Sequence, residues 1–386
     1  MNDQQILPTR EDEIADAIAD AGRDGDRLSI TGGGSKAGFG APVDARLLSL
    51  RGFTGIVDYD PAELVLTVRA GTPLAEVEAL VSSQNQMLAF EPFDHGPIYG
   101  EPNGAATIGG IVAAGVAGSQ RVSHGSARDH LLGFRAVSGR GESFVAGAKV
   151  VKNVTGYDLP KLAAGSWGRL FAMTELTLKV LPRPRVRTTR VIEGLDDAQA
   201  VKAMAAAMGS PTEIAAAAHV PEHVRDGGSL TAFRIQGFGP SVGARAAMLE
   251  ALLAPIGRVT PLDQVEAEGL WDELRTLAPL PADGLLWRIS VAPSASLAVI
   301  AALRPLGAQW LLDWAGGLIW LTANADPEIV RAAAAGAGGH AALVRAPEAI
   351  RATVPAFHPQ PAGVAALEAR VRRAFDPAGV FETGRF

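Results

Sequence analysis

Two glycine-rich stretches in the first third of the chain constrain its fold more than any other feature. The first, Gly32–Lys36 (GGGSK), follows a predicted strand at Leu28–Ile30, and the second, Asn103–Gly115, leads into small apolar residues. Glycine has no Cβ, so consecutive backbone N–H groups can turn toward one point and approach an anion closely. Two such stretches in one half of the chain predict a backbone cradle for a diphosphate.

The composition excludes several classes of site and partner. The net charge of -6 gives no reason to expect nucleic acid or an anionic membrane surface as a partner. The chain has no cysteine, which excludes disulfides, thiolate metal sites and iron–sulfur clusters, and we predict no metal site. Met1–Arg10 lacks the pattern of a secretory signal, and the apolar run Gly104–Gly118 is too short to span a bilayer. We therefore expect a cytoplasmic protein, with any peripheral contact with the inner membrane made through partner subunits.

Hydrophobic periodicity and turn residues predict the elements of a first domain over residues 1–182. Thr9 is expected to cap a helix that ends near Ala21, and Thr72-Pro73 to open a second helix that ends near Ser83. The expected strands are Leu28–Ile30, Ile56–Val57, Leu64–Arg69, Leu132–Val137, Ser143–Val145 and Leu170–Val180.

The proline-rich, basic segment Leu181–Arg185 is the clearest domain boundary. Beyond it, alanine-rich helices alternate with short strands, which predicts a second α+β domain over residues 183–350 with helices layered on an antiparallel sheet. The expected helices are Asp196–Met208, Val242–Leu253, Gln264–Leu277, Ser296–Leu303 and Glu328–Ala335. The expected strands are Leu230–Phe238, Leu285–Val291, Gln309–Trp314, Leu318–Thr322 and Ala341–Arg345. Ile214–Val220 fits a helix or a strand, a last helix is expected at Val364–Phe375, and no internal repeat is visible.

Three familiar motifs are incomplete in this sequence. The glycine runs at Gly32 and Gly237 both lack the last glycine of a Rossmann fingerprint, and no Walker lysine is present. His219–His223 has the H-x-x-E-H spacing of a zinc protease, but Pro221 breaks the helix that the motif requires. Gly33–Ala37 ends in alanine where the hydrolase nucleophile elbow needs glycine.

Candidate catalytic residues are few. His95, in the loop-like segment Phe93–Pro97, and His219 are candidates for a base, although a lone histidine is more often structural. Arg288 lies on a predicted strand next to strands that carry Asp313, Trp314 and Trp320. This group fits either a core with an edge-strand ion pair or a pocket wall in which Arg288 binds an anion.

Further motifs resemble the vanillyl-alcohol oxidase / p-cresol methylhydroxylase (PCMH) flavoprotein superfamily. Ala106–Gly110 and Gly125–Asp129 carry that likeness. Other stretches are similar to the FAD-binding subunit of bacterial glycolate oxidase (glycolate dehydrogenase). These are Val151–Leu159, Gly165–Gly168, Leu286–Val291, Asp313-Trp314 and Phe375–Phe381. The likeness covers nearly the whole chain. It implies an α+β fold with a two-subdomain PCMH-type FAD-binding domain, a ferredoxin-like cap, and a C-terminal segment, 351–386, that returns to the FAD domain.

The resemblance also assigns cofactor residues. The first pyrophosphate loop would comprise Gly32, Gly33, Gly34, Ser35 and Lys36, and the second Thr107, Gly109, Gly110, Ala114 and Gly115. Gly125, Arg128 and Asp129 would lie further along FAD, with Asn153, Tyr157 and Asp158 near the flavin. Trp167 and Arg169 stand where related catalytic subunits carry glutamate and threonine. Because cysteine is absent and no histidine adjoins the first loop, we expect noncovalent FAD.

The function implied by the resemblance is oxidation of a 2-hydroxy acid, glycolate to glyoxylate, within a multi-subunit enzyme. A larger flavin subunit would carry the acid–base residues, and an iron–sulfur subunit would accept the electrons. The alternative is a self-sufficient FAD-dependent glycolate or D-lactate dehydrogenase, and a third option is a structural subunit with an empty cleft. For direct oxidation, Arg288 is the first candidate to clamp the substrate carboxylate and Arg234 the second.

Overall fold

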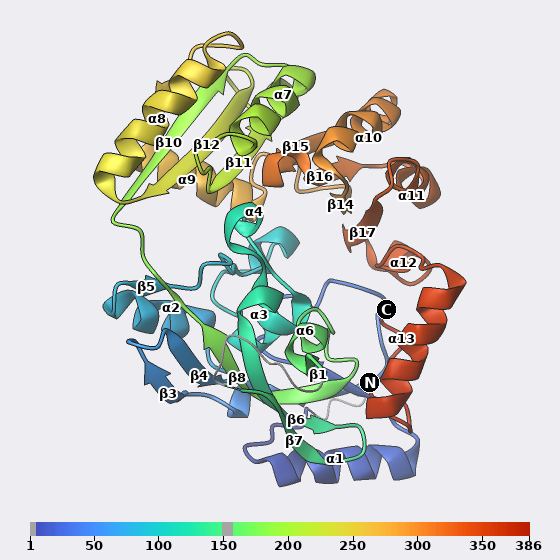
Figure 1. Cartoon of the computed structure of the whole chain (residues 1–386). Helices are drawn as coiled ribbons and strands as arrows, with labels where there is room; N and C mark the ends of the chain where they lie inside the picture. Colours follow the sequence, from blue (N-terminus) through green and yellow to red (C-terminus); the bar gives the residue numbers. More distant parts are fainter. Residues whose placement is uncertain (1–4, 149–156) are drawn as a thin grey trace.

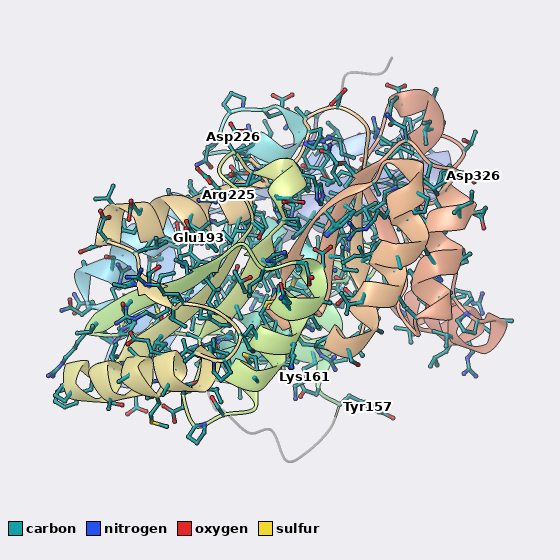
Figure 2. All side chains as sticks on the ribbon, turned by 90° about the horizontal axis from the view of Figure 1, so that it is seen from above. Tyr157, Lys161, Glu193, Arg225, Asp226 and Asp326 are labelled. Carbon is teal, nitrogen blue, oxygen red and sulfur yellow. The ribbon has the colours of Figure 1, made fainter. Side chains whose placement is uncertain are left out.

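The computed structural model describes residues 5–148 and 157–386, which form two parts, each built around one antiparallel sheet (Figure 1). The lower part in Figure 1 contains a five-stranded sheet, and the upper part, here named the cap, contains an eight-stranded sheet. Tyr157, where the description resumes, projects into solvent with 90 % of its surface exposed (Figure 2). The mixed α+β class expected from the sequence is confirmed.

The lower part orders its main sheet β3-β4-β8-β6-β7, with β1 and β2 forming a separate parallel pair. Its strands are β1 (Leu28–Thr31), β2 (Arg46–Ser49), β3 (Ile56–Asp60), β4 (Val65–Arg69), β5 (Gln86–Met87), β6 (Leu131–Ser138), β7 (Ser143–Gly147), β8 (Phe171–Lys179) and β9 (Leu181–Pro182). Its helices are α1 (Glu11–Asp24), η1 (Leu50–Gly52), α2 (Leu74–Ser83), η2 (Gly96–Tyr99), α3 (Ile108–Ala114), α4 (Arg121–His124), α5 (Ala127–His130) and α6 (Leu159–Ala163).

The predicted elements of this part are present, with shifts at their ends. Helix α1 buries Ile14, Ala17, Ile18 and Ala21, the periodic face on which its prediction depended. Helix α2 begins one residue later than expected, because Pro73 is the N-cap while the Thr72 hydroxyl donates to the Arg69 carbonyl at 2.8 Å. The short helices α3 to α6 were not anticipated, since they are too brief to show a helical period.

The cap follows the proline-rich boundary. Its strands are β10 (Val186–Glu193), β11 (Ala216–Val220), β12 (Leu230–Gly237), β13 (Thr260–Pro261), β14 (Leu285–Ser290), β15 (Gln309–Asp313), β16 (Leu318–Ala323) and β17 (His340–Arg345). Its helices are α7 (Asp197–Met208), η3 (Glu222–Val224), α8 (Gly239–Leu253), α9 (Gln264–Thr276), η4 (Pro293–Ala295), α10 (Ser296–Leu303), η5 (Arg304–Leu306), η6 (Trp314–Gly316) and α11 (Pro327–Gly336). The segment left open at Ile214–Val220 contains strand β11, whereas β10 was not predicted.

The cap contains a topological repeat that the sequence does not show. Strands and helices β10-α7-β11-β12-α8-β13 and β14-α10-β15-β16-α11-β17 each follow the order βαββαβ of a ferredoxin-like unit. The sheet order β13-β10-β12-β11-β15-β16-β14-β17 places the units side by side, each contributing its second strand to the join. No repeat is visible in the sequence because the two units share topology without visible sequence similarity.

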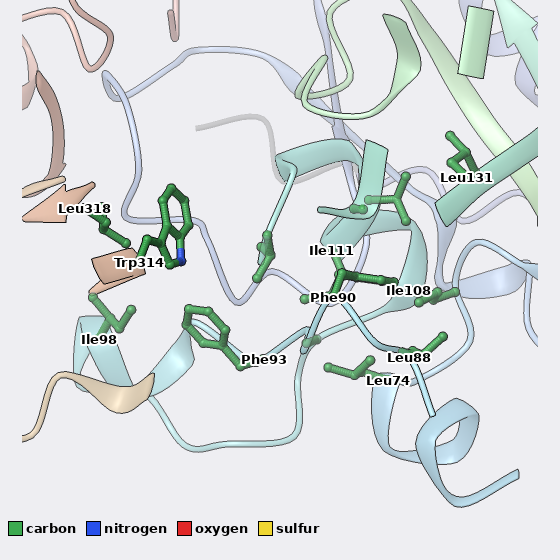
Figure 3. Close-up of a cluster of buried hydrophobic side chains, with 14 of the residues drawn as sticks. Leu74, Leu88, Phe90, Phe93, Ile98, Ile108, Ile111, Leu131, Trp314 and Leu318 are labelled. Atoms are coloured by element: carbon green, nitrogen blue, oxygen red, sulfur yellow. The ribbon is translucent and has the colours of Figure 1, made fainter. Parts of the chain in front are cut away.

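The two faces of the cap sheet have different roles. One face packs under α7, α8, α10 and α11, in a core that includes Phe233, Trp287 and Ile319. The other face shares a hydrophobic cluster with the lower part. In Figure 3, Trp314 and Leu318 of the cap lie near Phe93 and Ile98 of the lower part. The cap is thus joined to the lower part by a continuous apolar interface.

The last segment leaves the cap through α12 (Glu348–Arg351) and α13 (Ala362–Phe375) and runs back along the lower part (Figure 1). The Asp376 carboxylate accepts the N–H groups of Val380 and Phe381 at 2.9 and 2.7 Å, and the Val380 carbonyl accepts the Leu28 N–H at 2.8 Å. These bonds anchor the segment beside β1 and bring residues 381–386 to the first glycine loop.

Candidate functional site

The first glycine loop presents free backbone donors. The N–H groups of Gly32 to Lys36 make no hydrogen bond to any residue in the described part of the chain. Three carbonyl groups of this loop accept hydrogen bonds: Arg51 donates to Gly33, the Ala37 N–H donates to Gly34 at 2.9 Å, and Arg385 donates to Lys36 at 2.9 Å. Unpaired N–H groups on a loop held by its carbonyls form an anion-binding concavity.

The second glycine loop is organised by Asp94. Its carboxylate accepts the N–H groups of Gly96 at 2.9 Å, Gly104 at 2.8 Å and Ala106 at 3.0 Å. Burial favours a higher pKa for Asp94, but these N–H donors hold its pKa below the ordinary value. Asp94 is therefore ionised at neutral pH and fixes the turn that leads to Thr107.

The two loops are packed directly against each other. A Cβ on Gly33 would lie 1.3 Å from the Ala105 carbonyl oxygen, and a Cβ on Gly32 would lie 2.1 Å from the Thr107 hydroxyl oxygen. Gly109 is required for a different contact, since a Cβ at this position would lie 2.7 Å from Ala70. The Ala70 carbonyl accepts the Gly109 N–H. The glycines thus serve close backbone approach, and at Gly109 the N–H group is already used.

Both loops line one cleft of about 320 Å³, which we name the glycine-loop cleft. The residues assigned by resemblance that line it are Gly32, Gly33, Gly34, Ser35, Lys36, Thr107, Gly109, Gly110 and Ala114. Trp167 and Arg169 line it as well, and the Trp167 ring stacks on Phe39 at a centroid distance of 4.4 Å. Five free N–H groups and an aromatic wall in one cleft fit a dinucleotide with a diphosphate.

Lys36 carries an ammonium group without an anionic partner. It makes no ion pair or side-chain hydrogen bond within the described residues, and burial lowers its pKa to about 8, which the charge of Asp94 partly opposes. A half-buried cation beside free N–H donors has an unmet demand for negative charge. A bound diphosphate would supply it.

Other assigned residues are not brought to this cleft. Gly115 ends α3 with φ +65°, Asp129 caps α5 by accepting the Ser126 N–H at 2.8 Å, and Asp158 pairs with Lys161 at 2.7 Å. Like these three, Gly125, Arg128 and Tyr157 are absent from the cleft lining, and Asn153 lies outside the described residues. None of the six described residues lines the glycine-loop cleft.

A second cleft of about 650 Å³ lies between the lower part and the cap, and we name it the inter-domain cleft. Glu91 pairs there with Arg234, whose guanidinium lies 4.1 Å from the centroid of Trp271, and the Arg234 Nε is buried without a partner among the described residues. The Asp313 carboxylate accepts the Ser119 hydroxyl at 2.8 Å, and burial raises its pKa to about 6. The cleft therefore combines a cationic donor with a carboxyl that titrates near neutral pH.

Helix α3 connects the two clefts. Ala113 and Ala114 at its C-terminal end line the glycine-loop cleft, whereas Ala117, Gly118 and Ser119 line the inter-domain cleft. Three residues of chain span at most about 10 Å, so the linings of the two clefts lie close to each other at this segment.

Arg288 and the two histidine candidates differ in their surroundings. The Arg288 guanidinium lies over Trp314 at 4.9 Å and makes no hydrogen bond or ion pair to a described residue, while burial lowers its pKa to about 10. His95 stacks on Phe93, and burial lowers its pKa well below the ordinary value. His219 is 1 % exposed and bonds to the Thr231 hydroxyl at 2.9 Å. None of the three lines either cleft, and of the three only Arg288 carries a charge without an ion pair or hydrogen bond among the described residues.

Several residues that shape the site were not found from the sequence. Asp94, Arg51 and Arg385 act on backbone groups of distant loops, which leaves no local motif. The one sequence signal for Asp94 is its place in an irregular segment next to His95, and only His95 was predicted there as a site residue.

No helix among the described residues has the length and apolar character needed to cross a membrane.

Comparisons with known proteins agree with this geometry. Residues 3–147 match a family model described as an FAD binding domain. The chain is 36 % identical to glycolate oxidase subunit GlcE of Escherichia coli K12, over 93 % of this chain and 92 % of that relative. It is 33 % identical to a D-lactate dehydrogenase of Anaerostipes hadrus over 45 % of this chain, a match that spans 34 % of the dehydrogenase. The solved structure of p-cresol methylhydroxylase superposes with a TM-score of 0.70 over 99 % of this chain and 88 % of that one, at 15 % identity, which shows a shared fold.

Proposed function

Because the chain belongs to the family of the glycolate oxidase subunit GlcE, we propose that it is the FAD-binding subunit of a multi-subunit 2-hydroxy-acid oxidoreductase. The observation that carries this proposal is the loop Gly32–Lys36, whose five N–H groups lack partners among the described residues and whose residues line the glycine-loop cleft. FAD is the cofactor, and the diphosphate would be held by these N–H groups and by Lys36.

The FAD is noncovalent in this proposal. The chain has no cysteine, and no histidine or tyrosine lines the part of the glycine-loop cleft that the structure describes. No side chain of the kind that tethers flavin therefore lies beside the proposed cofactor.

The reaction is oxidation of glycolate to glyoxylate, and bound FAD supplies the two-electron acceptor. Glycolate oxidase subunit is the name of the relative that matches nearly end to end, so this chain works with partners. We assign the acid–base chemistry to a larger flavin subunit and the electron acceptor to an iron–sulfur subunit. This chain holds FAD and relays electrons between them.

A second candidate, a self-sufficient 2-hydroxy-acid dehydrogenase, is favoured by the inter-domain cleft. The unpartnered Nε of Arg234 would bind a carboxylate there, together with Arg288, whose guanidinium lies 6.0 Å from the ring centroid of Trp320 on the cleft wall. Asp313, held by Ser119, would accept the proton of the substrate hydroxyl. A carboxyl with a pKa of about 6 is ionised at neutral pH and basic enough to accept that proton.

Anaerobic titration with glycolate separates the two candidates. The purified chain is first loaded with FAD, and flavin absorbance is followed as glycolate is added to the chain alone and to the complete complex. Bleaching only in the complex supports the relay subunit, whereas bleaching of the isolated chain establishes the dehydrogenase. A chain that binds no FAD after reconstitution refutes both.

A further inference from the structure

The segment Glu382–Phe386 is bound to the outside of the first glycine loop. The Arg385 guanidinium donates to the carbonyl oxygens of Lys36 at 2.9 Å, Ala37 at 2.8 Å and Phe39 at 2.7 Å. The Arg385 carbonyl in turn accepts the Ala41 N–H at 3.0 Å. The segment and the loop are therefore bonded in both directions.

The three carbonyls held by Arg385 belong to the two turns that follow the free N–H groups. The Ala37 N–H donates to Gly34 at 2.9 Å, and the Phe39 N–H donates to Lys36 at 3.1 Å. A planar guanidinium with five donors can bind several carbonyls at fixed angles, which an ammonium group does less well. Arg385 thus fixes the shape of both turns.

Arg51 acts on the glycine loop itself by donating to the Gly33 carbonyl. Because a trans peptide unit is planar, its C=O and the next N–H point in opposite directions. The bond to Gly33 therefore directs the Gly34 N–H away from Arg51. Both arginines line the glycine-loop cleft, so their positive charges also lie near the position of the diphosphate.

Aromatic contacts also pack the segment Glu382–Phe386 against the wall of the glycine-loop cleft. The Phe386 ring lies 5.3 Å from the ring centroid of Trp167 and 5.7 Å from that of Phe39. Gly40, with φ +83°, packs against the Arg385 backbone, where a Cβ would lie 2.7 Å from the carbonyl oxygen. The position of the loop is therefore set by a segment more than three hundred residues away in the sequence.

We propose that Arg385 is a positioning residue for the cofactor, which holds the first glycine loop in its anion-binding conformation through the Lys36, Ala37 and Phe39 carbonyls. This inference rests on the proposed FAD binding. Arg51 assists at Gly33. Without Arg385 the loop samples conformations in which its N–H groups no longer converge, and the diphosphate is bound more weakly.

The test is FAD affinity of the full chain, measured by quenching of flavin fluorescence, for the wild type, R385M, R385K and R373M. Loss of one charge-assisted hydrogen bond lowers affinity by about tenfold, so R385M is expected to weaken FAD binding at least that much. R385K is expected to recover part of the loss, because an ammonium group retains the charge but not the planar fork. Arg373 is exposed on α13, and its side chain makes no ion pair or hydrogen bond with the described residues. R373M should therefore bind FAD as tightly as the wild type.

ADP, used as a competitor of FAD, tests whether the effect is on the diphosphate, and it should lose affinity in parallel. Folded R385M that binds FAD as the wild type does, with only a lowered melting temperature, overturns the proposal and leaves a structural role. Failure of the wild type to bind FAD is a different outcome and refutes the proposed function.

Hydrogen exchange on the wild type keeps the test independent of folding of the variant. FAD is expected to protect the peptides that contain residues 32–40 and 381–386 together. Protection of the loop without any change in the second peptide contradicts the coupling between them.

Discussion

The close packing of the two glycine loops gives the sharpest prediction, through the substitution Gly33→Ala. A Cβ at this position would lie 1.3 Å from the Ala105 carbonyl oxygen, whereas ordinary contacts begin at 3.4 Å, so the loops must separate by about 2 Å. Both partners are backbone, and no side-chain rotation can relieve the overlap.

The magnitude follows from the hydrogen bonds that this movement breaks. An N–H···O distance near 2.9 Å that lengthens by about 2 Å is no longer a hydrogen bond. Hydrogen bonds to charged groups contribute about 1.5 to 3 kcal/mol each. Loss of two N–H bonds from the first glycine loop to the diphosphate therefore weakens FAD binding by about 3 kcal/mol or more, at least a hundredfold.

Gly34→Ala is the matched control one residue away. Gly34 has φ +85° and no atom within 4 Å of its ideal Cβ, so alanine there strains the backbone without touching the second loop. We expect it to lower the stability of the chain by about 1 kcal/mol and to weaken FAD binding less than Gly33→Ala does.

The assay is flavin fluorescence quenching with both variants, after circular dichroism has verified that each is folded. Folded G33A with an FAD dissociation constant within a few-fold of the wild type would falsify the claim that contact between the loops shapes the diphosphate site. Equal losses in G33A and G34A would instead assign the effect to backbone strain.

Three further predictions concern the same clefts. Burial lowers the pKa of Lys36 to about 8, and a diphosphate raises that pKa again, so FAD binding takes up a proton above pH 8. The dissociation constant of FAD should then rise by up to about tenfold per pH unit from pH 8 to 10 in the wild type and stay nearly constant in K36M. A dissociation constant that does not depend on pH in the wild type contradicts the assignment of Lys36 to the diphosphate. Acid precipitation should leave all flavin in the supernatant, and flavin fluorescence on the denatured chain would exclude noncovalent binding. R288M should abolish the change in the flavin spectrum that oxalate causes in the FAD-loaded chain, with FAD content unchanged. The control R304M removes an arginine stacked on Trp310 at 4.9 Å and should retain that change. Oxalate binding that is unaffected by R288M would rule out Arg288 as the carboxylate clamp.

The sequence by itself determined much of the fold. Alternation of apolar residues at Leu170–Val180 predicted β8, and the periodic face of α1 predicted its burial, because both signals depend only on near neighbours. The prediction of a boundary at Leu181–Arg185 depends on an equally local signal, since prolines there interrupt any period. The glycine runs and the FAD family were also evident from residues adjacent in the chain.

Only the tertiary structure decided how the site is assembled. The contact of Gly33 with Ala105, the bonds from Asp94 to the second loop and those from Arg385 to the first all join residues distant in sequence. The tertiary structure also decided that residues 214–220 contain a strand and not a helix. β11 is buried between β12 and β15, and pairing with these strands provides hydrogen bonds for its backbone groups. The pairing of two ferredoxin-like units through β11 and β15 was hidden for a related reason. Topology is a property of strand order in space, and different side chains can fill the same order.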